Sequence, residues 1–159
     1  MHRKLTVIVI LAIISVALTF FSPLAIETTE GIFNTYSKQI TLFGGLGAPG
    51  CVIVTVLSGL SFILFSCATL AAGKYGEACK GAKISGVLFL IMQISSILQA
   101  LQYYDDSSVL GALRSEVSYN TVHPIAVVSV LLSIVATVFC FKVKKWEEAQ
   151  YYQPGEIDL

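Results

Sequence analysis

Four long segments without a charged residue constrain this chain more than any other feature. They are residues 5–26, 52–72, 84–101 and 124–141. Each is close to the roughly 17–25 residues that a helix needs to cross about 30 Å of hydrocarbon. An aliphatic or aromatic residue at the centre of such a helix favours insertion by roughly 0.3–0.6 kcal/mol, whereas one Asp or Lys opposes it by about 2.5–3.5 kcal/mol. All four segments are therefore predicted to insert into a membrane.

The composition points to the same class of protein. Charged residues make up only 13% of the chain, hydrophobic residues make up 55%, and the mean hydropathy is +0.79. Soluble domains carry about 25% charged residues, so a soluble fold of this length would have too few charges to cover its surface. We predict an all-α membrane protein with a four-helix transmembrane domain over residues 1–145. The lipid bilayer is its expected partner, and no nucleic-acid partner is expected.

The first segment has a second interpretation as a cleaved signal peptide. Arg3 and Lys4 form a basic region before it, and Ala25 lies near a potential cleavage point. The apolar run is longer than the roughly 7–15 residues of a signal peptide, however, and the point is not of the A-x-A type. A retained signal-anchor helix is the better prediction.

Basic residues concentrate on one side of the predicted membrane. Those before the first segment, between the second and third, and after the fourth are Arg3, Lys4, Lys74, Lys80, Lys83, Lys142, Lys144 and Lys145. The other two loops contain only Lys38 and Arg114. Short loops rich in Lys and Arg remain in the cytosol. Both termini are therefore predicted to be cytosolic, and the first and third loops are predicted to face outward.

The end of the first outer loop favours extended structure. Residues 40–43 are too few and too β-prone for a helix, and Gly44, Gly45 and Gly47 interrupt whatever they form. Pro49 and Gly50 are turn residues before the next apolar run. A short extracellular strand and loop, turned sharply into the second span, is the predicted cap of the bundle.

Small and weakly polar residues follow helical spacing in the second and third segments. Such residues mark contact faces in membranes, because helices there associate through close packing and hydrogen bonds. The second segment has Thr55, Gly59, Phe62 and Ser66; the third region has Ala82, Gly86, Phe89, Gln93, Ser96 and Ala100. These two helices are predicted to form a close antiparallel pair with Gln93 hydrogen-bonded across it. A substrate-contacting role is the alternative for Gln93.

The third loop is predicted to contain a short helix. Leu110, Leu113 and Val117 share a helical face, Asn120 would end the helix, and Pro124 would begin the fourth span. His123 is expected to cap or border that span, because no Cys, His or Glu stands at metal-ligand spacing from it.

The four cysteines are distributed over both sides of the predicted membrane. Cys51 lies at the outer edge, whereas Cys67, Cys79 and Cys140 lie at or near the cytosolic side. An internal disulfide is therefore not expected, and Cys51 is either free and packed or paired with a partner chain. Cys79 and Cys140 are candidates for acylation, with packing in a helix as the alternative for Cys67 and Cys140.

Motifs that carry chemistry are absent from the sequence. It has no C-x-x-C pair, no phosphate-binding glycine loop and no H-E-x-x-H. A non-enzymatic protein without catalytic residues, metal or cofactor is predicted. Residues 146–159 are expected to be a disordered cytosolic tail. Its last residues, Glu156–Leu159, suit a PDZ-type groove, with a plain solubilising tail as the alternative.

A short run in the first outer loop carries a family resemblance. The residues are Ile40, Thr41, Leu42, Phe43 and Gly44, followed by Cys51. They resemble the loop signature of the amastins, four-span surface proteins of kinetoplastid parasites that are themselves similar to claudin-like proteins in architecture. The family has a cysteine where Gln39 stands, and its second cysteine is nearer than Cys51. A disulfide of that loop, which the resemblance would imply, therefore lacks its first cysteine here.

The resemblance implies a structural, adhesive or surface-interaction role at the plasma membrane, with a second copy or another membrane protein bound through the outer loops. Two alternatives remain: a small transporter or channel subunit, and an accessory subunit of an organellar membrane complex. Coupled transporters usually bury ionisable residues within their spans, and the four segments contain none. The sequence therefore favours the interaction role.

Overall fold

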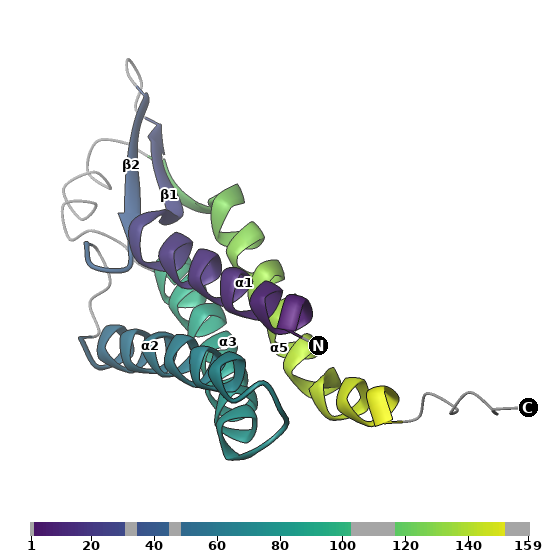
Figure 1. Ribbon diagram of the computed structural model, residues 1–159. Coiled ribbons are helices and arrows are strands. Elements are labelled where there is room, and N and C mark those ends of the chain that lie inside the picture. The colour runs from purple at the N-terminus through teal and green to yellow at the C-terminus, as the bar shows by residue number, and fades with distance from the viewer. Residues whose placement is uncertain (1, 31–34, 45–48, 103–116, 152–159) are drawn as a thin grey trace, which may run out of the picture.

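The computed structural model describes residues 2–30, 35–44, 49–102 and 117–151. Its elements are α1 (His2–Phe21), β1 (Pro23–Glu30), β2 (Thr35–Thr41), α2 (Pro49–Ala72), α3 (Glu77–Gln102), β3 (Val117–Val122) and α5 (Pro124–Tyr151). The described fold is mostly helical, and the strands lie together at one end of the helices (Figure 1). This confirms a bundle of four long apolar helices and replaces the all-α prediction with helices plus a small sheet.

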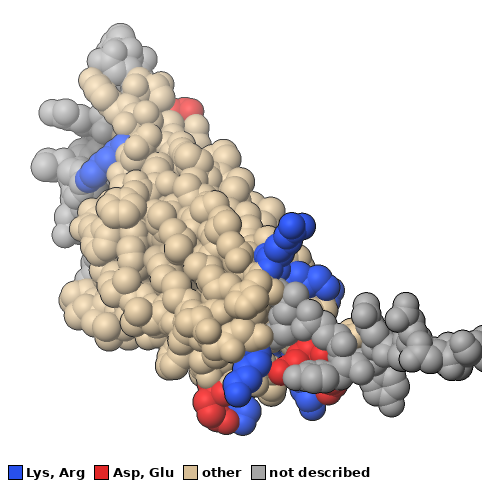
Figure 2. All heavy atoms as spheres, viewed as in Figure 1, with Lys and Arg blue, Asp and Glu red and all other residues tan. Residues whose placement is uncertain are grey.

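All four helices are long and apolar enough to cross a membrane. The helices α1, α2, α3 and α5 contain 20, 24, 26 and 28 residues, and each includes an 18-residue window with a mean hydropathy of 2.5, 2.3, 1.9 and 2.5, respectively. On the face shown in Figure 2, most Lys and Arg side chains gather where the helices end away from the sheet, and the middle of the molecule carries neither sign of charge. An uncharged belt between two polar ends is the distribution expected of membrane-spanning helices.

The helices pack as a ring in the order α1, α2, α3, α5, in which α1 also contacts α5. A short turn joins α2 to α3. In this turn, Gly73 has a φ of +66°, and its N–H bonds to Thr69 O at 3.0 Å. This left-handed residue just after a helix is a usual glycine cap. Side chains from all four helices form the main core: Leu5, Ile8, Ala12, Val16, Phe62, Cys79, Ala82, Phe89, Ala136, Cys140 and Val143.

The sheet is antiparallel with the strand order β2-β1-β3. In its register, Glu27 of β1 lies opposite Lys38 of β2 and Asn120 of β3. Asn120 Nδ2 donates to Ala100 O at 3.3 Å and to Leu101 O at 3.2 Å. These bonds satisfy carbonyls at the end of α3, which lack partners within the helix. A second core joins the sheet to the bundle: Leu24, Ala25, Ile40, Leu42, Ala100 and Ala126.

The predicted end of the first span was wrong. The apolar run continues to residue 26, but α1 ends at Phe21 and β1 begins at Pro23. Proline has no N–H to donate to the helix and disfavours helical geometry at the residue before it, here Ser22. Residues 24–26 are apolar because they cover the bundle, with Leu24 and Ala25 buried in the second core.

Other boundaries also differ from the prediction: α2 begins at Pro49 and α3 at Glu77, before the segments predicted from residues 52 and 84. The fourth helix was expected to end at residue 141 and a tail to begin at 146, but α5 continues to Tyr151. This extension has no Gly or Pro to end it and carries a Lys144–Glu148 ion pair at 3.8 Å, four residues apart. The strand predicted at residues 40–43 is instead β2, Thr35–Thr41.

The third loop also differs where it is described. Val117 and Asn120 belong to β3, not to the end of a helix. Pairing with β1 supplies backbone hydrogen bonds that a short isolated helix on the surface would make less favourably. The remainder of that predicted helix, like the predicted PDZ-type ending Glu156–Leu159, lies outside the described residues.

Candidate functional site

A buried polar cluster joins three helices in the interior of the bundle. The Gln93 side chain on α3 is 1% exposed. Its Nε2 donates to Thr19 Oγ1 on α1 at 2.5 Å and to Ser129 Oγ on α5 at 2.9 Å. The prediction that Gln93 bonds across the contact between α2 and α3 was therefore wrong. The hydroxyl acceptors that Gln93 reaches lie on α1 and α5 and not on α2.

The hydrogen-bond donors of this cluster all have acceptors, whereas one acceptor oxygen is left unpaired within the described part of the chain. The Gln93 amide has two N–H donors, which serve the two hydroxyl oxygens. Those hydroxyls both donate to Ser15 O, from Thr19 at 2.8 Å and from Ser129 at 3.0 Å. Gln93 Oε1 has no partner among the described residues, and the small cavity that the Gln93 side chain helps to line has no room for a water molecule. The cluster therefore locks α1, α3 and α5 together and does not form a wet path.

The contact between α2 and α3 is built from glycines that face phenylalanines. A Cβ at Gly59 would lie 2.9 Å from Phe89 Cε2, and a Cβ at Gly86 would lie 2.9 Å from Phe62 Cε2. The same Cβ at Gly86 would lie 2.8 Å from Thr137 Oγ1 of α5. Each glycine therefore makes room for an aromatic ring of the other helix, and Gly86 also lets α5 approach.

Hydroxyl groups continue this contact toward the sheet. Thr55 Oγ1 and Ser96 Oγ are 3.2 Å apart, and Cys51 Sγ lies 3.4 Å from Ser96 Oγ. Ser66, near the other end of α2, is buried. The ten residues predicted to lie on the contact faces of α2 and α3 are thus all buried in the bundle, although Gln93 has different partners. Cys51 is a free, buried thiol that packs against α3.

The loop signature divides into core, turn and surface. Ile40 and Leu42 are buried in the second core. Thr41 Oγ1 accepts a hydrogen bond from the Gly44 N–H at 3.0 Å and so closes the turn that leaves the strand. Phe43 is 62% exposed, and its ring meets that of Phe20 edge to face at 6.0 Å between centroids. The run therefore attaches the sheet to the bundle and leaves one aromatic side chain outside.

The exposed strand of the sheet is β2. Its residues Thr35 to Gln39 are all exposed, and Tyr36 is 65% exposed. Among the described strands, β2 pairs with β1 on one side and has no strand on the other. Unpaired edges of this kind can accept a strand from another chain.

Sequence reasoning missed the other half of the sheet. Tyr119 Oη of β3 donates to Glu30 Oε1 of β1 at 3.1 Å, and this bond to a carboxylate raises the pKa of Tyr119. The alternation of Val117, Tyr119 and Thr121 was the available sign of a strand.

The basic end of the bundle is held by contacts between segments far apart in sequence. The Tyr75 N–H donates to Glu147 Oε2 at 3.1 Å, and Lys4 Nζ lies 5.0 Å from the centroid of the Trp146 ring. The two thiols proposed for acylation are buried between α3 and α5, where Cys79 Sγ lies 3.6 Å from Cys140 O. Their burial favours the packing interpretation over acylation.

The described residues contain no group of three or more His, Cys, Asp and Glu side chains that is placed to hold a metal ion. His123 instead accepts a hydrogen bond at Nδ1 from the Ile125 N–H at 3.2 Å, in the first turn of α5. Comparison of the chain with models of protein families, with curated protein sequences and with solved structures finds no match in any of the three.

Proposed function

We propose that this chain is a non-enzymatic multi-pass membrane protein whose sheet serves as a contact surface outside the membrane. The four helices span the bilayer, both termini are cytosolic, and the sheet faces outward at the plasma membrane. Its role is structural or adhesive, like that of the amastins that its loop resembles. The partner is a second copy or another membrane protein.

The distribution of charge supports this orientation. The end of the bundle away from the sheet carries Lys4, Lys74, Lys83 and Lys142. In contrast, the three described strands together contain a single basic residue, Lys38. Loops rich in Lys and Arg remain on the cytosolic side during insertion. The sheet is then carried to the other side of the membrane.

The observation that carries the proposal is the exposed edge of β2. An extended segment of a partner can add to such an edge through main-chain hydrogen bonds, and exposed side chains then give specificity. Tyr36 supplies a large side chain with an apolar ring and a polar tip, and tyrosine is enriched in protein interfaces. The second core packs the sheet against the helices, so the position of the β2 edge relative to the bundle is fixed.

The interior of the bundle supports a contact role over transport. The Gln93 amide nitrogen donates to Thr19 and Ser129, whose hydroxyls donate to Ser15 O, and the small cavity that these side chains line has no room for a water molecule. A path for ions or polar solutes requires water or exchangeable ligands along it.

Cross-linking at the cell surface tests the proposal. Ser37→Cys places a thiol on the exposed part of β2. An impermeant reagent with a maleimide at one end and a photoreactive group at the other should join this thiol to a second copy or to a neighbouring membrane protein. Tyr36→Lys should reduce this adduct, because charge on an edge strand opposes pairing. The matched control is Thr121→Lys, which places the same charge on β3. Absence of any adduct, or ion flux through the purified protein in liposomes, would contradict the proposal.

A further inference from the structure

An open groove of about 620 Å³ runs along the outside of the contact between α3 and α5. The groove has an apolar wall formed by Ile84, Val87, Leu88, Ile91 and Phe141. Its basic end is formed by Lys80 and Lys83. The wall is open to the surroundings, because Ile84 is 71% and Ile91 is 56% exposed. From Ile84 to Ile91 the α3 backbone rises about 10 Å. This wall suits a hydrocarbon chain lying along the helix.

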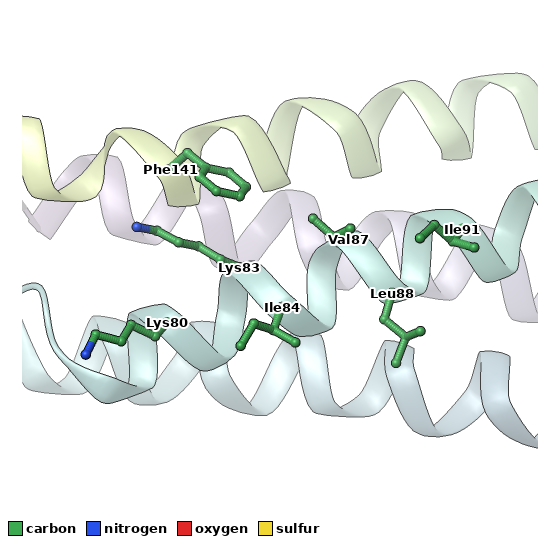
Figure 3. A pocket seen from close by; sticks show the side chains of 7 residues that line it. All are labelled: Lys80, Lys83, Ile84, Val87, Leu88, Ile91 and Phe141. Carbon is green, nitrogen blue, oxygen red and sulfur yellow. The ribbon is translucent and has the colours of Figure 1, made fainter.

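The position of Lys83 in the sequence places the basic end of the groove at the edge of the predicted membrane-spanning segment. Lys83 directly precedes the charge-free segment 84–101, so its ammonium lies where hydrocarbon gives way to headgroups. In Figure 3, Lys83 extends from α3 toward the ring of Phe141 on α5. Its Nζ lies 5.3 Å from the centroid of that ring and 4.5 Å from the centroid of the Tyr75 ring. Aromatic faces attract an ammonium without neutralising it.

The two lysines differ in what they offer a ligand. Lys80 Nζ is paired with Glu77 Oε1 at 2.6 Å and extends away from Phe141 in Figure 3. Lys83 has no carboxylate within ion-pair distance among the described residues, and its Nζ lies 3.5 Å from Tyr75 Oη. Lys83 is therefore the positive charge available at the mouth of the groove, and Tyr75 adds a hydroxyl beside it.

We infer that this groove binds an anionic phospholipid of the cytosolic leaflet, with one acyl chain along α3 and the phosphate and headgroup at Lys83. This inference rests on the proposed membrane insertion. An anionic phospholipid fits this groove because the apolar wall can contact an acyl chain, and the Lys83 ammonium, which has no ion-pair partner among the described residues, lies at the level of the lipid headgroups. A juxtamembrane basic residue attracts anionic lipid, and a lined groove makes the attraction site-specific.

A second groove on the same helix provides an internal comparison. It lies between α2 and α3, has a volume of about 500 Å³, and is lined by residues that include Leu57, Phe65 and Leu88. Its lining contains no basic residue. Hydrocarbon should contact both grooves in a bilayer, but preference for an anionic headgroup is expected only between α3 and α5.

The test counts lipids that remain bound to the full chain, purified from vesicles of equal parts phosphatidylserine and phosphatidylcholine and measured by native mass spectrometry. The protein should retain phosphatidylserine in preference to phosphatidylcholine. Lys83→Gln should lower phosphatidylserine retention about fivefold, and Lys142→Gln, which changes a lysine outside the groove, should not. Val87→Trp, which fills the groove, should lower retention, whereas Leu57→Trp, which fills the comparison groove, should leave it unchanged.

Each other result overturns the inference. Equal retention of the two lipids, or loss of preference with Lys142→Gln alone, would remove the groove as the site. Displacement of phosphatidylserine by millimolar inorganic phosphate would make the site one for a free anion. A dimer that Val87→Trp abolishes would make a second copy the occupant. Failure of the chain to float with vesicles would instead refute the proposed membrane insertion, which separates the two hypotheses.

Discussion

Gln93 Nε2 of α3 lies 2.9 Å from Ser129 Oγ of α5, at the point where both helices also meet α1. The side chain that donates this bond is almost completely buried. In an apolar environment an amide without partners is costly, so the bond favours the one arrangement of helices that supplies two hydroxyl acceptors. Gln93 therefore specifies which helices are neighbours as well as how strongly they associate.

Gln93→Leu should destabilise the bundle by about 0.6–2 kcal/mol, the range measured for hydrogen bonds between membrane helices. The loss is modest because Thr19 and Ser129 still donate to Ser15 O. Thermal unfolding in detergent measures it, with Gln102→Leu at an exposed position of α3 as the control. An unchanged or raised melting temperature for Gln93→Leu would show that the cluster does not hold the helices.

Gly86→Leu should destabilise the fold by about 1–3 kcal/mol, the usual cost of overpacking. Even a Cβ at this position would meet Thr137 and Phe62 at less than ordinary contact distance. Gly59→Leu should behave similarly because of Phe89. The control is Gly50→Leu, where a Cβ meets nothing within 4 Å. If Gly86→Leu and Gly59→Leu melt like this control, the close packing of α2 and α3 is incorrect.

Glu147→Ala should loosen the turn between α2 and α3, because the Tyr75 N–H loses its acceptor. A typical net hydrogen bond contributes about 1 kcal/mol, so the turn should open about fivefold more often. Trypsin cleavage after the exposed Lys74 in inside-out vesicles reports this opening. Glu148→Ala removes the adjacent carboxylate, which pairs with Lys144 of its own helix, and should leave the cleavage rate unchanged.

The orientation can be tested with one introduced cysteine at a time, in a chain that carries Cys67→Ala so that the remaining native thiols, Cys51, Cys79 and Cys140, are all buried. Ser37→Cys on β2 should react with an impermeant maleimide on intact cells, whereas Lys145→Cys on α5 should react only after permeabilisation. Both positions are exposed, so the difference reports sidedness and not burial. The reverse pattern would overturn the outward position of the sheet.

Short-range patterns in the sequence predicted the helices well. Uncharged runs located all four, and the spacing of Thr55, Gly59 and Ser66 identified the buried face of α2 before its neighbours were known. Both signals depend on residues within one helix, and membrane insertion and helix packing select strongly on them.

Features that depend on distant pairing were missed or misplaced. Apolar residues 24–26 continue the first span in sequence, yet they form a strand because β2 and β3 supply partners on both sides. Leu110, Leu113 and Val117 have helical spacing, but Val117 pairs with Glu30 in the sheet. Gln93 was identified as a buried hydrogen-bonding residue but was assigned partners on the wrong helix, because Thr19 and Ser129 lie 74 and 36 residues from it in the sequence.

The central strand has a mechanical consequence for the helices below it. β1 follows α1 after a single residue, and β3 precedes α5 after a single residue, so each strand extends one helix of the pair. Because β1 and β3 are hydrogen-bonded in a fixed register, a piston movement of α1 along α5 would require their ladder to slip, and a slip by one residue would turn every side chain to the opposite face. We therefore expect α1 and α5 to move together along the bundle axis and not to slide past each other.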